Sequence, residues 1–274
     1  MTYGWAILII AVVLAALFQL GVFNSTNFAP KAPPGACQVF RPNGPGSTSF
    51  INLEGVCSGE LPQFVGNFNG ASSTVITVGT QSDLNIAGPL TVAGWANPSA
   101  VENGAIYDQN SCNSQYELFF DTTPNGNMRV ANTNNYYTAS HFYPVNEWVF
   151  VVGTFDGSYV RLYLNAALVG GPTAFSGSVN GHSGGTGYIG ELPGCGYNFN
   201  GMIADVQIYN TSLSANDVTA LYDEGIGGAP IDLQNLVGWW PLNGNANDYS
   251  GNNNNGVPTG VTFVSNWYSG YTPP

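Results

Sequence analysis

The sequence predicts an all-β sandwich or barrel that is preceded by one long hydrophobic α-helix. Residues 4–23 carry no charge and a single polar side chain, Gln19. From about residue 64 onward, short runs of alternating apolar and polar residues follow one another, with turn residues between them. Such regular alternation is typical of a β-sandwich or barrel and not of βαβ units.

The N-terminal segment has the length of a membrane span. Twenty residues of α-helix rise about 30 Å, which is the thickness of the hydrocarbon core of a bilayer. A secretory signal would have a basic start, a shorter apolar stretch and a small-residue cleavage site, whereas the first basic residue here is Lys31. We therefore expect residues 1–23 to lie in a membrane or in the core of a protein assembly.

The amino-acid sequence of residues 1–10 and 20–24 resembles the N-terminal helix of archaeal type IV pilin-like proteins. The sequence departs from that pattern because the leader, the processing site and the Glu that usually come before this stretch are not present. The resemblance implies a filament whose core is a bundle of these helices, and a plain single-span membrane anchor is the alternative. The residues expected to pack in the filament core are Trp5, Ile9, Val13, Leu17 and Leu20.

Residues 24–63 are expected to form a stalk with a small disulfide-bonded lobe. Residues 24–49 are rich in Pro, Gly and Ser, and Pro fixes φ and disfavours helix. The head would then comprise residues 64–274. Strands are predicted in it at residues 73–78, 90–96, 116–121, 148–155 and 159–165, where apolar and polar residues alternate.

One short helix is predicted after the last long strand. Ser214 and Asp217 form a pair that resembles a capping box, which marks a helix N-terminus. An apolar stripe that includes Val218 and Leu221 follows, and Gly225 is expected to end the helix.

Several motifs of the head resemble the laminin-G-like, concanavalin A-like jelly roll. They are Gly94-Trp95, residues 148–157, residues 162–165, and residues 199–210 followed by Leu213-Ser214. The resemblance implies a jelly-roll β-sandwich. It departs at Asn165-Ala166, where the family usually has Asn-Gly or Asp-Gly. Because a tight primed hairpin turn favours Gly, we expect a wider loop at this position.

Residues 236–251, which begin the C-terminal segment 236–274, resemble the segment that normally opens such a domain, although here they follow the closing helix. Three explanations stay open: a circularly permuted domain, a second domain cut short, and a strand donated to a neighbouring subunit.

Composition places the head outside the cell. The net charge is −12 although only 7% of residues are charged, so the acidity reflects a lack of Lys and Arg. Nucleic acid is excluded as a partner because its binding needs a basic surface. Four cysteines allow three pairings, of which we favour Cys37–Cys57 and Cys112–Cys195. Glycosylation sequons begin at Asn24 and Asn210.

The sequence predicts that the protein is not an enzyme. A glycosidase needs two carboxyl groups that flank the scissile bond, and Glu102, Glu117, Glu147 and Glu191 are isolated from other acids along the sequence. A Ser-His-Asp arrangement has only His141 and His182 to draw on, and neither lies near a nucleophile elbow.

A structural calcium ion is the cofactor that the resemblance implies. In related jelly rolls an Asp on the closing strand binds Ca²⁺ together with the opening segment. The matching residue here is Asp205, and Asp248 in the turn of residues 247–251 is the expected second carboxylate. Carboxylate oxygens are ligands that Ca²⁺ prefers. The alternative is that Asp205 only accepts hydrogen bonds from backbone amides and that Asp248 forms an Asx turn.

A carbohydrate site would need aromatic rings that stack on sugars and amide groups that bond their hydroxyls. Residues 132–143 and 194–199 combine both kinds of side chain. The candidate binding residues are Tyr136, Tyr137, His141 and Tyr197.

Taken together, the sequence predicts a subunit of an extracellular surface filament. The helices would be inserted in the membrane before assembly and would then associate in the core of a helical homopolymer, and jelly-roll heads would form an outer, adhesive surface. The alternative is a membrane-anchored monomeric lectin that binds glycans, and a weaker third option is a subunit of a secretion or adhesion machine.

Overall fold

The computed structural model describes residues 62–79, 82–110, 115–132, 135–179, 185–272 and 274, together with the backbone of two strands at 37–42 and 48–53. The chain separates into two compact units: Met1–Arg41 with Thr48–Ser58, and Pro42–Ser47 with Gly59–Pro274. In the first unit, β1 (Cys37–Pro42) pairs with β2 (Thr48–Leu53). The predicted N-terminal helix and its five assembly residues lie outside the described residues, so the filament and anchor alternatives stay predictions.

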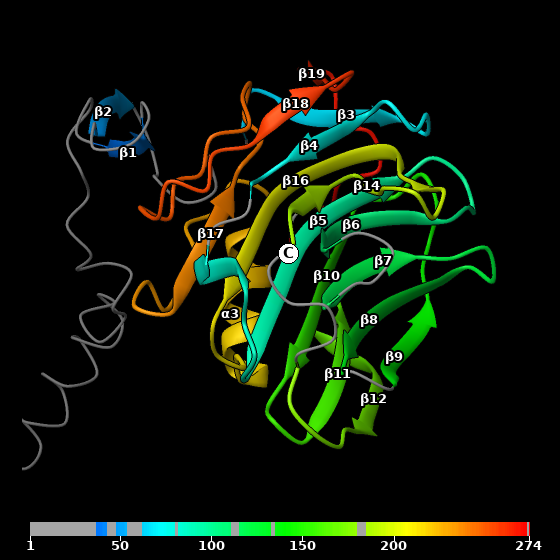
Figure 1. The fold of residues 1–274 in the computed structure, drawn as a ribbon. Coiled ribbons are helices and arrows are strands. Elements are labelled where there is room, and N and C mark those ends of the chain that lie inside the picture. The colour runs from blue at the N-terminus through cyan, green and yellow to red at the C-terminus, as the bar shows by residue number, and fades with distance from the viewer. Residues whose placement is uncertain are drawn as a thin grey trace, which may run out of the picture. The chain divides into compact units, whose positions relative to one another are not determined.

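The second unit is a sandwich of two antiparallel sheets (Figure 1). The eight-stranded sheet has the order β12 (Ala167–Ala174), β11 (Tyr159–Leu164), β10 (Val149–Phe155), β5 (Leu90–Pro98), β16 (Asn200–Tyr209), β3 (Val65–Asn69) and β19 (Thr262–Val264), with β17 (Leu236–Trp240) also paired to β16. The seven-stranded sheet has the order β18 (Val257–Thr259), β4 (Val75–Thr77), β13 (Gly187–Ile189), β6 (Gly104–Gln109), β7 (Tyr116–Phe120), β8 (Asn125–Ala131) and β9 (Tyr136–Phe142). The smaller elements are β14 (Glu191–Leu192), β15 (Tyr197–Asn198), a 3-10 turn η1 (Ser82–Leu84) and one α-helix, α3 (Ala215–Glu224).

The main core lies between the two sheets. Alternate residues of each strand point into it, for example Val160 and Leu162 of β11, which are fully buried. A second apolar cluster covers the other face of the eight-stranded sheet, where Trp95 and Phe150 contact α3 and the C-terminal segment. Burial on both faces explains why β5 and β10 are buried along their whole length.

The predicted helix is confirmed as α3. The hydroxyl of Ser214 accepts a hydrogen bond from the Asp217 amide, and the Asp217 carboxylate accepts one from the Ser214 amide. Gly225, with φ of 73°, is the C-cap. Val218 and Leu221 bury the apolar stripe against the second cluster.

The hairpin between β11 and β12 contradicts the expectation of a wide loop. Leu164 pairs directly with Ala167, so only two residues form the turn. Asn165 and Ala166 have φ values of 47° and 63°, which is the left-handed combination of a primed turn. The Asn165 side chain accepts a hydrogen bond from the Phe150 amide at 2.9 Å. This contact, with the flanking ladder, holds Ala166 in a conformation that Gly would adopt more easily.

The C-terminal segment pairs with strands of the same head. β17 lies antiparallel to β16, β18 to β4 and β19 to β3, so the segment contributes one strand to the seven-stranded sheet and two to the eight-stranded sheet. This arrangement corresponds to the permuted-domain alternative. It places residues from the two ends of the head side by side (Figure 1).

Candidate functional site

The outer face of the seven-stranded sheet carries a row of aromatic rings around one arginine. The Arg129 guanidinium on β8 lies 4.7 Å from the centre of the Tyr136 ring on β9 and 4.9 Å from that of Phe119 on β7. Tyr197 on β15 packs on Phe119 with ring centres 5.8 Å apart. We call Tyr197, Phe119, Arg129 and Tyr136 the arginine row. Cation–π contacts of this kind are worth about 0.5–2 kcal/mol each and fix the rings in place.

Glu117 holds Arg129 from the neighbouring strand. The two residues are direct cross-strand partners of β7 and β8, and their side chains form an ion pair. Glu117 is fully buried, whereas 22% of the Arg129 side chain is exposed. The pair therefore leaves little net charge at the row while keeping the guanidinium fixed between two rings.

Two of the four predicted carbohydrate-binding residues, Tyr136 and Tyr197, belong to the arginine row. Tyr137 points to the opposite face of β9, where its ring packs on Phe175 at 4.5 Å and its hydroxyl lies 2.8 Å from that of Ser176. The bond to Ser176 lowers the pKa of Tyr137. His141 is exposed and pairs with Gly126 at the far end of β9. The structure thus places Tyr136 on the outer face of β9, Tyr137 and His141 on the opposite face of that strand, and Tyr197 on β15.

The sequence reasoning missed Arg129 and the environment of Glu117. Glu117 is isolated from acids along the chain, but the β6–β7 register sets it directly opposite Asp108, and both residues are fully buried. Cross-strand neighbours follow from register, which the alternation pattern alone does not supply. Arg129 carried one usable signal, because it is one of only four basic residues and lies inside a strand-like run.

The two predicted calcium ligands lie on either side of Trp239. The indole Nε1 of Trp239 donates to Asp205 Oδ1 at 2.6 Å, and its backbone amide donates to Asp248 Oδ1 at 2.9 Å. Asp205 sits in a bulge of β16 with φ of 54°, and its carboxyl is buried. Burial raises the pKa of Asp205 to about 7, although hydrogen bonds from Trp239 and Gln207 lower it in part.

The donors around these carboxylates do not fit a bound cation. Asp248 also accepts hydrogen bonds from the amides of Ser250 and Asn254 and from the Ser250 hydroxyl, at 2.8–2.9 Å. The hydrogen bond from the Ser250 amide to Asp248 Oδ1 forms an Asx turn, which is the alternative interpretation of Asp248 given above. N–H and O–H groups thus point at oxygens that a calcium ion would need. Within the described ranges, no group of three or more His, Cys, Asp or Glu side chains could hold a metal.

Two covalent features fall partly within the described chain. Cys195 is disulfide-bonded, while its predicted partner Cys112, like the side chains of Cys37 and Cys57, lies outside the described residues. Asn210 is exposed at the end of β16, where a glycan would meet solvent; Asn24 lies outside the described residues. The pairings and the occupancy of both sequons stay predictions.

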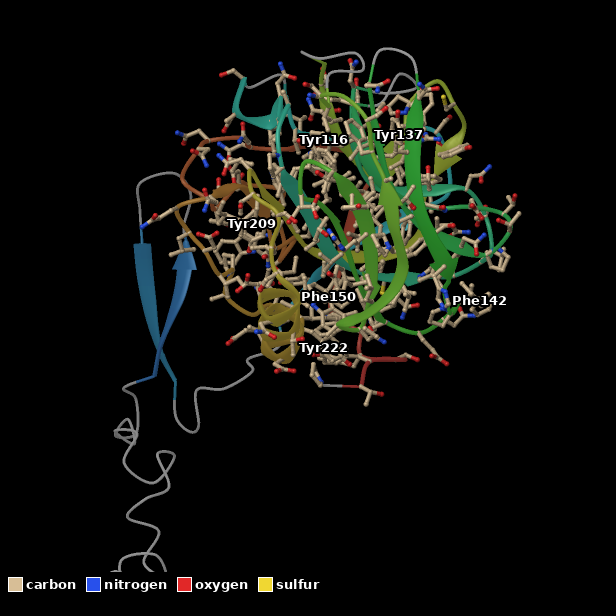
Figure 2. The ribbon with its side chains drawn as sticks, turned by 90° about the horizontal axis from the view of Figure 1, so that it is seen from below. Tyr116, Tyr137, Phe142, Phe150, Tyr209 and Tyr222 are labelled. Carbon is tan, nitrogen blue, oxygen red and sulfur yellow. The ribbon has the colours of Figure 1, made fainter. Side chains whose placement is uncertain are left out.

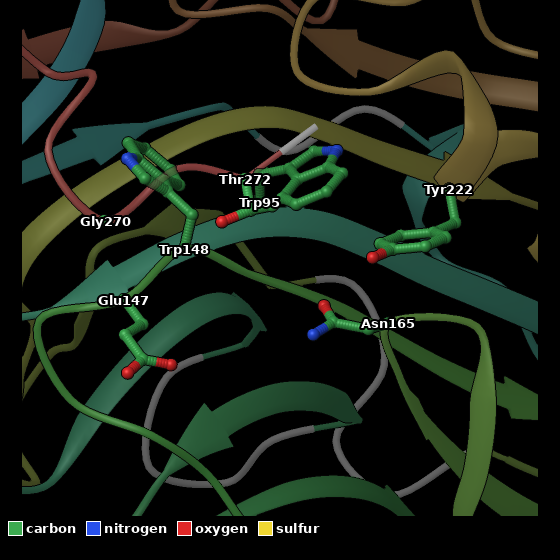
Figure 3. Close-up of a pocket in the computed structure, with 7 residues that line it drawn as sticks. All are labelled: Trp95, Glu147, Trp148, Asn165, Tyr222, Gly270 and Thr272. Carbon is green, nitrogen blue, oxygen red and sulfur yellow. The ribbon is translucent and has the colours of Figure 1, made fainter. Parts of the chain in front are cut away.

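A pocket of about 360 Å³ opens on the other side of the sandwich, between the eight-stranded sheet, α3 and the C-terminal segment (Figure 3). Glu147, Asn165 and Tyr222 are among the residues that line it. Trp95 and Trp148 line it but are only 1% and 5% exposed, since each is covered by other rings. Figure 2 shows this aromatic packing where Phe150 lies beside Tyr222. The pocket therefore offers polar contacts but little ring surface for stacking.

None of the helices in the part of the chain that the structure describes has the length and apolar character of a membrane span. This finding does not concern residues 1–36, which lie outside that part.

Comparison with known proteins shows the fold of the head. The family model described as Laminin_G_3, concanavalin A-like lectin/glucanases superfamily, matches residues 69–219. One similar solved structure is a "putative carbohydrate binding protein" from Bacteroides ovatus, with a TM-score of 0.56 and 16% sequence identity. The match covers 80% of this chain and 64% of that protein's chain. The native heptameric SAP-like pentraxin from Limulus polyphemus has a TM-score of 0.51 and 17% identity over 77% of this chain and 99% of its own. No curated protein matches the sequence.

Proposed function

Because the chain belongs to the concanavalin A-like lectin/glucanases superfamily, we propose that its head binds neutral glycans on the outer face of the seven-stranded sheet, at the arginine row. The observation that carries the proposal is the Tyr136 ring. It is 50% exposed although Arg129 holds one side of it. A large aromatic ring that is both fixed and open to solvent is a surface on which the apolar face of a sugar can stack.

Charge favours neutral glycans over acidic ones. The chain has 16 acidic and 4 basic residues, and the two arginines whose side chains the structure describes are each paired, Arg129 with Glu117 and Arg161 with Asp156. A sulfated or carboxylated glycan would meet a negative field and no free cation at the row. Hydrogen bonding and ring stacking are then the interactions left for recognition.

A glycan array probed with the full-length chain tests the proposal, and the chain contains a matched control. Tyr159 is 42% exposed and packs against Arg161, which pairs with Asp156, so it repeats the chemistry of the arginine row elsewhere on the head. Tyr136→Ala is expected to weaken binding to neutral glycans, and Tyr159→Ala is expected to preserve it. Equal effects of the two substitutions, or no binding to any neutral glycan, would contradict the proposal.

The uncharged residues 4–23 favour a second, compatible role as an extracellular filament subunit. In this role the apolar helices associate by burial of about 25 cal/mol per Å², and the heads display the glycan site along the fibre. Electron microscopy of material sheared from expressing cells, with mass spectrometry of the band, tests it. Fibres that contain this chain support the filament, whereas a chain that stays in the membrane pellet without fibres supports the anchored lectin.

A further inference from the structure

We infer that the site extends along the outer face of β9 and takes a linear neutral glycan of several sugar residues, bound along its length rather than at its end. This inference rests on the proposed glycan-binding function. It concerns four residues that follow one another on that face, which we call the β9 strip: Tyr136, Thr138, Ser140 and Phe142.

The register places the strip on the side of the arginine row. Tyr136, Thr138 and Phe142 pair with residues 131, 129 and 125 of β8, and side chains two apart on a strand share a face. The contact between Tyr136 and Arg129 identifies that face as the outer one. Ala139, which lies between the strip residues, points inward and is 1% exposed.

An exposed aromatic ring stands at each end of the strip. Phe142 is 61% exposed and Tyr136 is 50% exposed, and Figure 2 shows Phe142 at the periphery of the head. Phe142 contributes little to the stability of the core, because an apolar side chain stabilises the fold only when it is buried. Six residues of extended strand separate the two rings by about 20 Å, a span that a single sugar does not reach.

Hydroxyl groups fill the strip between the rings. No hydrogen bond within the described chain engages the side-chain hydroxyl of Thr138 or Ser140, so both are available as donors and acceptors for sugar hydroxyls. Alternation of ring, hydroxyl, hydroxyl and ring matches a chain whose sugar units offer an apolar face and hydroxyl edges in turn.

The edge of β9 is closed to a different occupant, an added β-strand. Thr173 Oγ1 of β12 donates to the Thr138 carbonyl at 2.9 Å. A Cβ placed on Gly170 of β12 would lie 2.9 Å from both the amide and the carbonyl of Ser140, so the two strands already meet there. Strand addition by a peptide needs free backbone groups along this edge. The outward face, and not the edge, is the surface left for a partner.

Binding of linear neutral oligosaccharides of increasing length to the full-length chain tests the inference. The probes are glucose and mannose, and the disaccharides and hexasaccharides of β-1,4-glucan, β-1,3-glucan and α-mannan, measured by calorimetry. We expect a hexasaccharide to bind at least tenfold more tightly than its disaccharide. Phe142→Ala is expected to weaken the hexasaccharide about three- to tenfold, the range of one aromatic contact, and to leave the disaccharide unchanged.

Tyr136→Ala is expected to weaken both the hexasaccharide and the disaccharide, because Tyr136 belongs to the arginine row. Leu233→Ala removes an apolar side chain that is 69% exposed and not part of β9, and it serves as the control. Equal affinity for short and long glycans, with no effect of Phe142→Ala, would overturn the extended site while the glycan-binding function stands. Failure of all glycans to bind would overturn both.

Discussion

Replacing Asp205 by Asn is expected to remove a large pH dependence from the stability of the head. Burial raises the pKa of the Asp205 carboxyl from 3.8 to about 7, and the hydrogen bonds from Trp239 and Gln207 offset only part of this effect. In the unfolded chain the carboxyl is solvated, and its pKa returns to the ordinary value. The folded and unfolded chains therefore bind different numbers of protons over a defined pH range.

The sign and size of the effect follow from this difference. Between about pH 4 and pH 7 the folded chain keeps a proton on Asp205 that the unfolded chain has released, so the free energy of unfolding falls as the pH rises. The pKa values differ by about 3, which at about 1.4 kcal/mol per pKa unit gives an upper bound of about 4 kcal/mol. Asn does not titrate, and it can still accept the bond from Trp239.

Urea unfolding of the full-length chain, followed by tryptophan fluorescence from pH 4 to pH 8, measures this contribution. The free energy of the Asp205→Asn chain minus that of the natural chain should rise with pH by up to about 4 kcal/mol and level off above pH 7. Other ionisable groups contribute to both chains and cancel. Asp223→Asn, on the exposed side of α3, is the control. A difference that stays constant across this range would refute the reasoning.

Three further predictions concern the turn, the ion pair and the calcium ligands. Ala166→Gly is expected to raise the free energy of unfolding by about 1 kcal/mol, because it relieves left-handed strain; a lower melting temperature would contradict the primed turn. Arg129→Met is expected to cost about 3 kcal/mol in urea unfolding, because buried Glu117 loses its cation. The Arg129→Met, Glu117→Gln double variant should recover part of that loss, and no recovery would argue against the pair. Millimolar Ca²⁺ is expected to leave the melting temperature unchanged; a rise that grows with its concentration and disappears in Asp248→Asn would restore the calcium site.

Local signals predicted the elements of the head well. The capping pair Ser214 and Asp217 and the terminal Gly225 are the ends of α3 in the structure, because caps depend on residues only a few positions apart. Alternation located β5, β7, β10 and β11 to within about two residues, as period-2 burial is a property of each strand by itself. The prediction of a wide loop at Asn165-Ala166 was wrong because it considered only the local preference of Ala. The paired strands β11 and β12 on either side impose a tight turn that Ala by itself disfavours.

The candidate site could be predicted only in part. Tyr136 and Tyr197 were predicted because each lies in a segment that combines aromatic and amide side chains. Tyr137 and His141 were grouped with them because the strand alternation of β9 was not recognised. Phe142 and Arg129 were not chosen. A residue's face depends on the strand in which it lies, and a one-residue error moves every side chain to the other face.

The sequence by itself determined the class of the fold, the uncharged N-terminal segment and the shortage of basic residues, because these are sums over composition and local period. Only the tertiary structure decided which residues meet. It brings Glu117 opposite Asp108, joins Arg129 to rings from two other strands, and places Trp239 between Asp205 and Asp248. Such contacts join residues distant in the chain, and their identity depends on register and sheet order, which the packing of the whole core selects.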